Sequence, residues 1–150
     1  MGNRAILAFE DAGVRIHDSV GIYLHWNGGR DSVEGFLLAA KCYGLRSGDY
    51  GIARLTQIIG NFIGGTLSLG VGVVGRMDNS DNGIYWINEH FEITGREIVG
   101  TAEDLEAILA PDGEQSMYPL SDMVDEVRQK NDYYFINVRG NRINSTLDKC

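Results

Sequence analysis

The chain has 150 residues, a formal net charge of −8 and 43% hydrophobic residues. It predicts a single domain over residues 1–150 with a buried core and a polar tail from residue 140 onward. No apolar run reaches ~18 residues, so no membrane span is predicted, and the acidic balance argues against binding along a nucleic-acid backbone. The only cysteines are Cys42 and Cys150, which predicts a reducing cytosol with Cys42 as a small core residue.

The N-terminal part of the chain predicts strands. They are expected at Arg4–Phe9, Val14–His17 and Gly21–Trp26, with a turn at Asp11-Ala12-Gly13. In the third strand Trp26 shares a face with Ile22 and Leu24, so we expect it to pack in the core. His25 lies on the opposite face, where it is either a hydrogen-bonded structural histidine or a residue that contacts a ligand or transfers a proton.

Asn27-Gly28-Gly29-Arg30 joins the third strand to a predicted helix. Asp31 is placed to cap this helix, and Glu34 follows at the capping-box spacing. Glycines before a helix N-terminus offer backbone N–H groups and the positive end of the helix dipole to an anion such as phosphate. The alternative is a tight strand-to-helix turn in which the glycines adopt positive φ.

The remaining elements predict the fold class. A second amphipathic helix is expected at Tyr50–Gly64, strands at Thr66–Val74, Ile84–Asn88 and Phe91–Val99, helices at Leu105–Ala110 and Asp122–Lys130, and a late strand at Tyr133–Val138. Strands joined by short turns, with helices gathered in blocks, predict an α+β fold. We expect a mainly antiparallel sheet with two adjacent amphipathic helices and further C-terminal helices.

The segment Asp78–Glu89 has the spacing of an EF-hand calcium loop, with oxygen-bearing residues, a glycine and a distant carboxylate, apart from Ser80 at the third position. An EF-hand joins two helices, whereas both flanks here are predicted strands, and Asn82-Gly83 is by itself a hairpin signal. We therefore interpret the segment as a polar hairpin loop. No metal or cofactor is predicted, and calcium binding by this loop stays an open alternative.

The string NGGRDS at Asn27–Ser32 resembles the SGGxDS loop of the PP-loop ATP pyrophosphatases, with Asn27 in place of the first serine. Such a domain needs parallel strands, and hence another strand soon after the first helix. Here the next predicted element is a second helix. A PP-loop-like ATP-binding enzyme is therefore kept only as an alternative.

Every charged residue from Glu103 to Glu126 is acidic. One interpretation is a surface that blocks a basic protein partner, which makes an acidic inhibitor of a host defence effector, such as a CRISPR nuclease, an alternative function. The other interpretation is an ordinary solvated helix face.

The chain supplies the side chains that a nucleotide site needs: rings, amides and cations. The predicted ligand-binding residues are Tyr23, His25, Asn27, Gly28, Gly29, Arg30, Arg54, Asn61, Trp86 and Arg96. Gly28, Gly29 and Arg30 are expected beside phosphate. Arg54 or Arg96 is expected to supply a second cation. Tyr23 or Trp86 is expected to stack on the base. No HExxH, CxxC or carboxylate dyad stands out, so the sequence predicts a binding protein without catalytic residues.

Several motifs resemble small proteins of phages and prophages, chiefly from Gram-positive bacteria. They are Asn3-Arg4-Ala5, YLHWNGGRDSVE at Tyr23–Glu34, the Tyr50–Phe62 helix, Asp81-Asn82-Gly83-x-Tyr85 and Ile93-x-Gly95-Arg96. The resemblance covers residues 2–99, and these proteins look like the Thoeris anti-defence sponges. It implies a homo-oligomer in the host-cell cytosol that sequesters a cyclic ADP-ribose type signal without cleaving it. It assigns no ligand contact to any residue of this chain.

Overall fold

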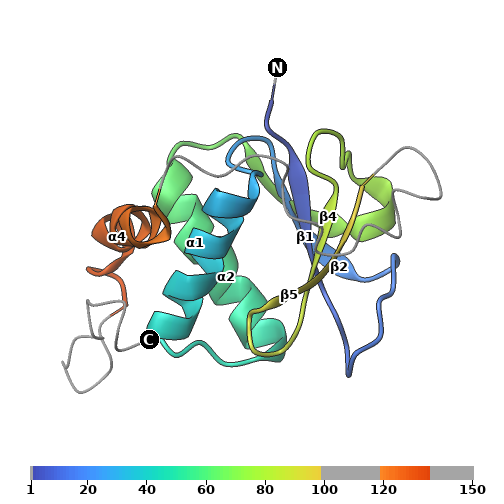
Figure 1. The fold of residues 1–150 in the computed structure, drawn as a ribbon, viewed down its shortest axis with the longest axis horizontal. Helices are drawn as coiled ribbons and strands as arrows, with labels where there is room; N and C mark the ends of the chain where they lie inside the picture. The colour runs from blue at the N-terminus through green and yellow to red at the C-terminus, as the bar shows by residue number, and fades with distance from the viewer. Residues whose placement is uncertain (1, 99–118, 136–150) are drawn as a thin grey trace. The chain divides into compact units, whose positions relative to one another are not determined.

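The computed structural model describes residues 2–98 and 119–135, and this part of the chain has an α+β fold. The elements are β1 (Ala5–Phe9), β2 (Val20–Leu24), α1 (Arg30–Cys42), α2 (Gly48–Ile63), β3 (Leu69–Val73), the 3-10 turn η1 (Val74–Arg76), β4 (Ile84–Ile87), β5 (Ile93–Glu97) and α4 (Leu120–Asn131) (Figure 1). The chain divides into two compact units: Met1–Arg30 with Thr66–Gln115, and Asp31–Gly65 with Ser116–Cys150. The described strands belong to the first unit, and α2, α4 and almost all of α1 belong to the second.

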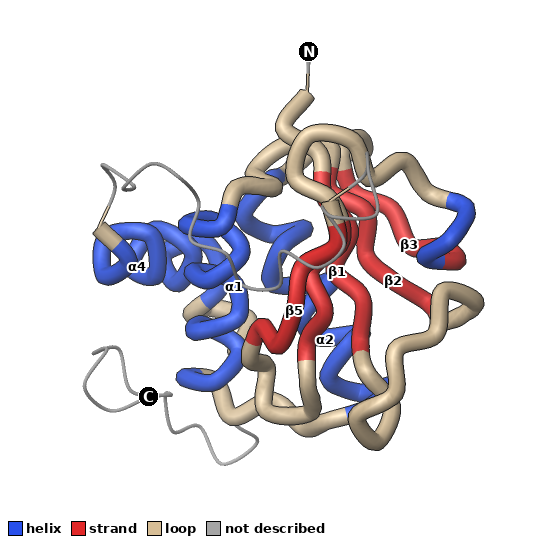
Figure 2. The backbone as a smooth tube through the Cα atoms, turned by 45° about the vertical axis from the view of Figure 1, so that its right-hand side comes forward, coloured by secondary structure: helices blue, strands red, loops and turns tan. Residues whose placement is uncertain are grey.

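The strands of the first unit form one sheet in the order β3-β2-β1-β4-β5 (Figure 2). β2 pairs antiparallel with β1 and β3, and β4 pairs antiparallel with β5. Within the described sheet, β1 and β4 form the parallel pair. The sheet is therefore mainly antiparallel, which confirms the predicted fold class.

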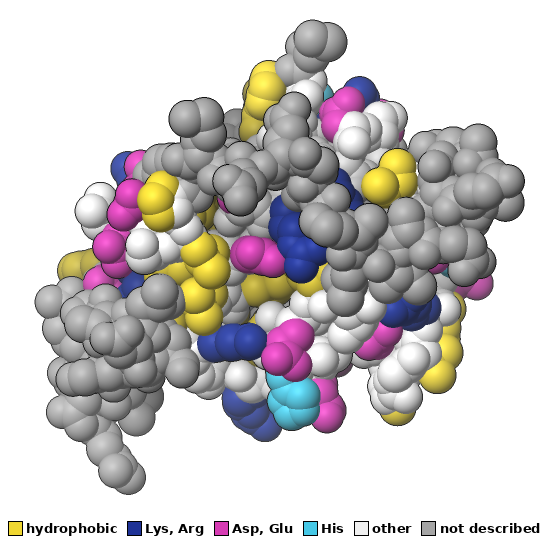
Figure 3. Space-filling model, in the orientation of Figure 1, with side chains coloured by type: hydrophobic (Ala, Val, Ile, Leu, Met, Phe, Trp, Pro, Cys, Tyr) yellow, Lys and Arg dark blue, Asp and Glu magenta, His cyan; other side chains and the backbone are white. Residues whose placement is uncertain are grey.

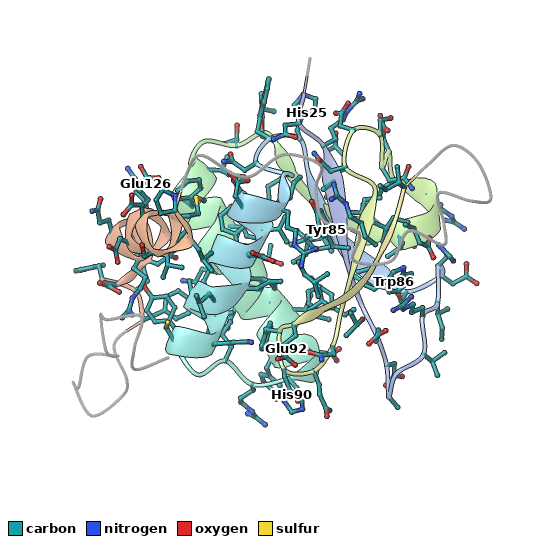
Figure 4. The ribbon with its side chains drawn as sticks, viewed as in Figure 1. His25, Tyr85, Trp86, His90, Glu92 and Glu126 are labelled. Carbon is teal, nitrogen blue, oxygen red and sulfur yellow. The ribbon has the colours of Figure 1, made fainter. Side chains whose placement is uncertain are left out.

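Both faces of the central strand β1 are buried, as its uninterrupted apolar sequence AILAF requires. On one face a cluster of buried residues comprises Ile6, Ala8, Val74, Ile84 and Trp86, with Tyr23 and Met77 packed against it. On the other face Leu7 lies in register with Ile22 of β2 and Tyr85 of β4, and all three side chains are fully buried. Tyr85 and Trp86 leave β4 on opposite sides (Figure 4).

The strand expected at Val14–His17 is wrong. Val14 forms only an isolated bridge with Asp11, across the turn that the sequence predicted. The alternation of Val14 and Ile16 resembles a strand, but both side chains are largely exposed, and the polar residues between and after them make the specific contacts. Arg15 bonds to Glu10 and to the Thr94 carbonyl, and His17 pairs with Glu97 at 2.8 Å.

The hairpin expected around Asn82-Gly83 is also wrong. β3 pairs with β2, and β4 pairs with β1 and β5, so the segment between β3 and β4 crosses from the edge of the sheet to its other side. Gly83 has a φ of 80°, as a tight turn favours, yet the turn does not join two paired strands. Local turn chemistry was predicted correctly here, but the strand pairing was not.

In the second unit the closest helix packing is between α2 and α4. Gly35 of α1 lies so close to Met123 of α4 that an added Cβ would overlap the Met123 side chain, and Phe36 meets Phe62 of α2 edge-to-face at 5.4 Å. The two helices α1 and α2 are consecutive in the chain, as expected. However, α1 buries residues around most of its circumference, so the amphipathic description does not fit it.

The start of α1 lies two residues before the one that the predicted capping box implies. The helix begins at Arg30, so Asp31 lies inside its first turn, where its carboxylate accepts a hydrogen bond from the Ser32 N–H at 2.8 Å. An acid in the first turn still favours the helix through the dipole.

Cys42 is buried, as predicted for a small core residue, and it is disulfide-bonded. The chain's other cysteine, Cys150, lies outside the described residues.

Several predicted features fall partly or wholly outside the described residues. The helix at Leu105–Ala110, the polar tail from residue 140 and most of the acidic 103–126 segment cannot be compared. Tyr133 and Tyr134, the start of the expected late strand, lie in a turn after α4, because the Tyr134 N–H bonds back to the Asn131 carbonyl. None of the helices that the structure describes has the length and apolar character needed to cross a membrane.

Candidate functional site

Tyr23, His25 and Trp26 form a group of rings at the end of β2, which we call the ring cluster. The Tyr23 hydroxyl lies 2.9 Å from Nδ1 of His25. The His25 and Trp26 rings meet edge-to-face, with centroids 5.3 Å apart and an interplanar angle of 82°. His25 therefore holds Trp26 on one side and is itself held by Tyr23.

Trp26 does not pack in the core, as the sequence had led us to expect: 46% of its surface is exposed. The physical reason is that β2 ends at Leu24, so the alternation that places Ile22 and Leu24 inward stops before Trp26. Asn27 then adopts a φ of 60°, which turns the chain toward α1. An exposed tryptophan whose ring is fixed by a neighbour is a natural stacking platform for a flat ligand.

A second group lies beside the ring cluster and consists of Arg4, Asp78 and Asp81, which we call the Arg4 clamp. The Arg4 guanidinium bonds to Asp78 at 2.6 Å and to Asp81 at 2.9 Å. The two groups are neighbours, because the side chain of His25 and that of Arg4 both lie within 3.2 Å of the position that a Cβ on Gly2 would take. The clamp ties the segment before β4 to the start of β1.

The acids of the clamp are held in their charged forms. Hydrogen bonds from the Arg4 side chain and backbone hold the pKa of Asp81 below its ordinary value, and the nearby His25 lowers it further. Hydrogen bonds from the Ser80 hydroxyl and N–H, with Arg4 adding a smaller effect, lower the pKa of Asp78. A carboxylate with a lowered pKa is a weak general base at neutral pH.

The Arg4 clamp also bears on the EF-hand-like spacing of Asp78–Glu89. Its first and fourth residues, Asp78 and Asp81, both bind Arg4, and the segment itself contains β4, so it is not a loop between two helices. Across residues 2–98 and 119–135 the structure shows no group of three or more His, Cys, Asp or Glu side chains arranged to hold a metal.

Gly28 serves the fold and does not present its N–H to a ligand. Its N–H donates to the Asn3 carbonyl at 2.8 Å, and its own carbonyl accepts from the Tyr85 hydroxyl at 2.9 Å. A Cβ at this position would overlap the Asn3 carbonyl oxygen and lie 2.8 Å from the Ala5 Cβ. Gly28 is thus required for close approach to β1, and neither it nor Gly29 adopts the positive φ that we considered.

Two further predicted ligand residues belong to the interior of the first unit. Trp86 is fully buried and meets His17 edge-to-face at 5.6 Å, so it has no exposed ring for stacking. Arg96 is 6% exposed; its guanidinium bonds to the carbonyl and side chain of Asn82 and lies 4.6 Å from the centre of the Tyr85 ring. Both side chains are used to hold the sheet together.

Arg54 and Asn61 lie on α2, in the second unit. Arg54 is exposed and donates to Gln57 at 2.8 Å. Asn61 donates to the buried Asn131 of α4 at 2.9 Å, so this amide joins two helices. Of the ten predicted residues, Tyr23 and His25 are therefore in contact in the structure. Asn27, Gly29 and Arg30 follow them in the sequence.

The sequence reasoning missed Trp26 and Arg4 as members of the site. Trp26 was assigned to the core because an alternating pattern does not reveal where a strand ends. Arg4 belongs to the Asn3-Arg4-Ala5 motif, but its partners lie more than seventy residues away, and spacing alone gives no sign of them.

The arrangement around the diglycine turn differs from that of a PP-loop. β2, which leads into the turn, pairs antiparallel with both neighbours, and the Gly28 N–H already has an acceptor. Comparison with protein-family models, with curated proteins and with solved structures finds no match. The function must therefore be argued from the site itself.

Proposed function

We propose that the protein binds a small nucleotide-derived ligand at the ring cluster and holds it without cleaving it. The observation that carries this proposal is the exposed Trp26 ring, fixed edge-to-face by a His25 that is bonded to Tyr23. Stacking on such a platform suits any flat base. Arg30, four residues after Trp26, is the first residue of α1, where the positive end of the helix dipole adds to its charge.

Retention without cleavage fits the acid–base groups near the rings. Both carboxylates are held charged and weakly basic: hydrogen bonds from Ser80 mainly lower the pKa of Asp78, and hydrogen bonds from Arg4 mainly lower the pKa of Asp81. The Nδ1 atom of His25 is hydrogen-bonded to the Tyr23 hydroxyl at 2.9 Å. A ligand bound here would meet stacking and hydrogen-bonding groups in place of a catalytic pair.

The biological role that we propose follows the phage resemblance: an anti-defence protein in the host-cell cytosol that sequesters a cyclic ADP-ribose type immune signal. On the surface drawn in Figure 3, basic and acidic side chains are interspersed. This pattern suits a compact ligand better than a long polyanion, which requires a continuous basic stripe.

Native mass spectrometry after incubation with cyclic ADP-ribose isomers, cyclic oligonucleotides and ATP with Mg²⁺ tests the proposal. We expect one compound to remain bound and to be recovered with unchanged mass after heat denaturation. Recovery of a hydrolysed or rearranged product would show an enzyme instead. Failure of all three classes to bind would refute a nucleotide-type ligand.

One observation favours a second candidate, an acidic inhibitor of a defence protein. On α4, Met123, Val124 and Val127 are buried, while Asp122, Asp125 and Glu126 are exposed. The exposed acids form one face of the helix. Replacing these three acids by lysine should abolish inhibition if this face docks to a basic partner, and should leave it unchanged if the protein acts by sequestering a ligand.

A further inference from the structure

β3 is an edge strand of the described sheet, paired with β2 on one side (Figure 2). The His25 N–H donates to the Ser68 carbonyl, and the Val74 N–H donates to the Ser19 carbonyl. These two bonds determine which residues of β3 are hydrogen-bonded to β2. By the alternation of an antiparallel ladder, Gly70 and Gly72 direct their N–H and C=O groups toward β2, and Leu69, Val71 and Val73 direct theirs outward. No described strand pairs with these outward groups.

The apolar face of the sheet continues uncovered at this edge. Ile22 of β2 is fully buried, whereas Val71, its partner in register on β3, is 58% exposed. Val20, which is paired with Val73, is 48% exposed. Such an edge lacks the charges, prolines and bulges by which soluble proteins prevent strand pairing.

The opposite edge strand, β5, is protected. It carries Arg96 and Glu97, and the carbonyl of Thr94 accepts a hydrogen bond from Arg15 at 3.1 Å. The Arg15 guanidinium also lies against Gly95, within 2.8 Å of the position of an added Cβ. The contrast between the two edges points to β3 as a surface kept open for pairing.

Charge favours a second copy of this chain as the occupant. The protein carries a net charge of −8, so two copies repel each other over most surfaces. Between Arg54 and Arg76 the sequence contains no charged residue, and β3 lies within this stretch. The edge can therefore meet itself without bringing like charges into contact.

We propose that two copies pair through β3 in antiparallel fashion about a two-fold axis at Val71. In this register Val71 lies opposite Val71, Leu69 opposite Val73, and Gly70 opposite Gly72. Apolar side chains then meet apolar side chains on one face and glycines meet on the other, and the outward groups of Leu69, Val71 and Val73 bond across the axis. The result is one continuous sheet through both copies. This pairing does not depend on a ligand at the ring cluster.

Analytical ultracentrifugation of the full chain without ligand tests the association. The wild type should have twice the 16.5 kDa mass of one chain. Val71→Lys should be a monomer, because the substitution would place two lysine ammonium groups face to face in the dimer. Val14→Lys is the matched control, since Val14 is also an exposed valine of the first unit, at 54%, and it should remain a dimer. A monomeric wild type, or a dimer that survives Val71→Lys, would overturn the proposal.

Amide hydrogen exchange by NMR tests the register. In the dimer the N–H groups of Leu69, Val71 and Val73 should exchange as slowly as those of Gly70 and Gly72. In Val71→Lys, the N–H groups at positions 69 and 73 should exchange fast while those of the two glycines stay protected by β2. Fast exchange at all three outward positions in a dimeric wild type would place the interface elsewhere and refute this pairing.

Discussion

The amide of Asn131 should contribute strongly to the stability of the second unit. The residue is fully buried, its Nδ2 donates to the Ile58 carbonyl at 3.0 Å and to the Val127 carbonyl at 2.8 Å, and its Oδ1 accepts from Asn61 at 2.9 Å. Since each buried hydrogen bond contributes about 1 kcal/mol, Asn131→Ala should lower the free energy of unfolding by about 3 kcal/mol. The carbonyls keep their helical partners, which limits the loss.

Equilibrium urea unfolding followed by circular dichroism at 222 nm measures this effect. Gln129→Ala, at an exposed position of the same helix, is the control and should change stability by less than about 0.5 kcal/mol. Asn131→Asp keeps the side-chain volume but turns a carboxylate toward two carbonyl oxygens, so it should destabilise at least as much as Asn131→Ala. If Asn131→Ala unfolds with the same midpoint as the control, the proposed role of this amide is wrong.

A double-mutant cycle with Asn61→Ala separates a structural from a ligand-binding role for Asn61. The single substitution removes one hydrogen bond and should cost about 1 kcal/mol, with a coupling to Asn131 of similar size. Binding of any ligand should be unchanged. Zero coupling together with weakened ligand binding would return Asn61 to the binding site.

Three further outcomes are expected. Gly28→Ala should destabilise the fold by about 1–3 kcal/mol, because its Cβ would overlap the Asn3 carbonyl, whereas Gly70→Ala, whose Cβ would make only ordinary contacts with Tyr23, should be tolerated better; thermal unfolding compares the two. Carboxyl NMR should show the pKa of Asp81 below its ordinary value of 3.8, and Arg4→Gln should return this pKa toward 3.8. The Asp81 carboxylate therefore contributes to stability above pH 3.8, and this contribution is lost as the pH falls through the lowered pKa. Iodoacetamide should label Cys42 only after reduction, as peptide mapping can detect, and labelling without reductant would contradict the disulfide.

The sequence predicted those elements whose patterns are local. The β2 strand, both helices after it, and the β4 and β5 strands follow from apolar periodicity and turn residues, and their bounds agree within a few residues. Periodicity also suggested a strand at Val14–His17. It failed there because the exposure of Val14 and Ile16, the hydrogen bond from Arg15 to the Thr94 carbonyl and the His17–Glu97 ion pair decide the structure, and the local pattern reveals none of them.

The candidate site could be predicted only in part for the same reason. The roles of Trp26 and Trp86 were exchanged: one follows the last residue of β2 and is exposed, whereas the other lies within the central sheet and is buried. Composition cannot distinguish them, because both lie in segments that the sequence predicts as strands, Gly21–Trp26 and Ile84–Asn88. Likewise, an arginine of a nucleotide site and one that holds a turn, as Arg96 holds Asn82, differ only in tertiary partners.

Fluorescence titration tests ligand stacking on the ring cluster most directly, because Trp26 and Trp86 are the only tryptophans and only Trp26 is exposed. With cyclic ADP-ribose isomers or cyclic oligonucleotides, the Trp26 emission should be quenched while that of buried Trp86 persists. Calorimetry should then show that Trp26→Leu weakens affinity about 5- to 150-fold, the loss of one stacking contact of about 1–3 kcal/mol. Tyr50→Leu, which removes another exposed ring, should bind as the wild type does. Unchanged affinity in Trp26→Leu for a ligand that the wild type binds would contradict the site.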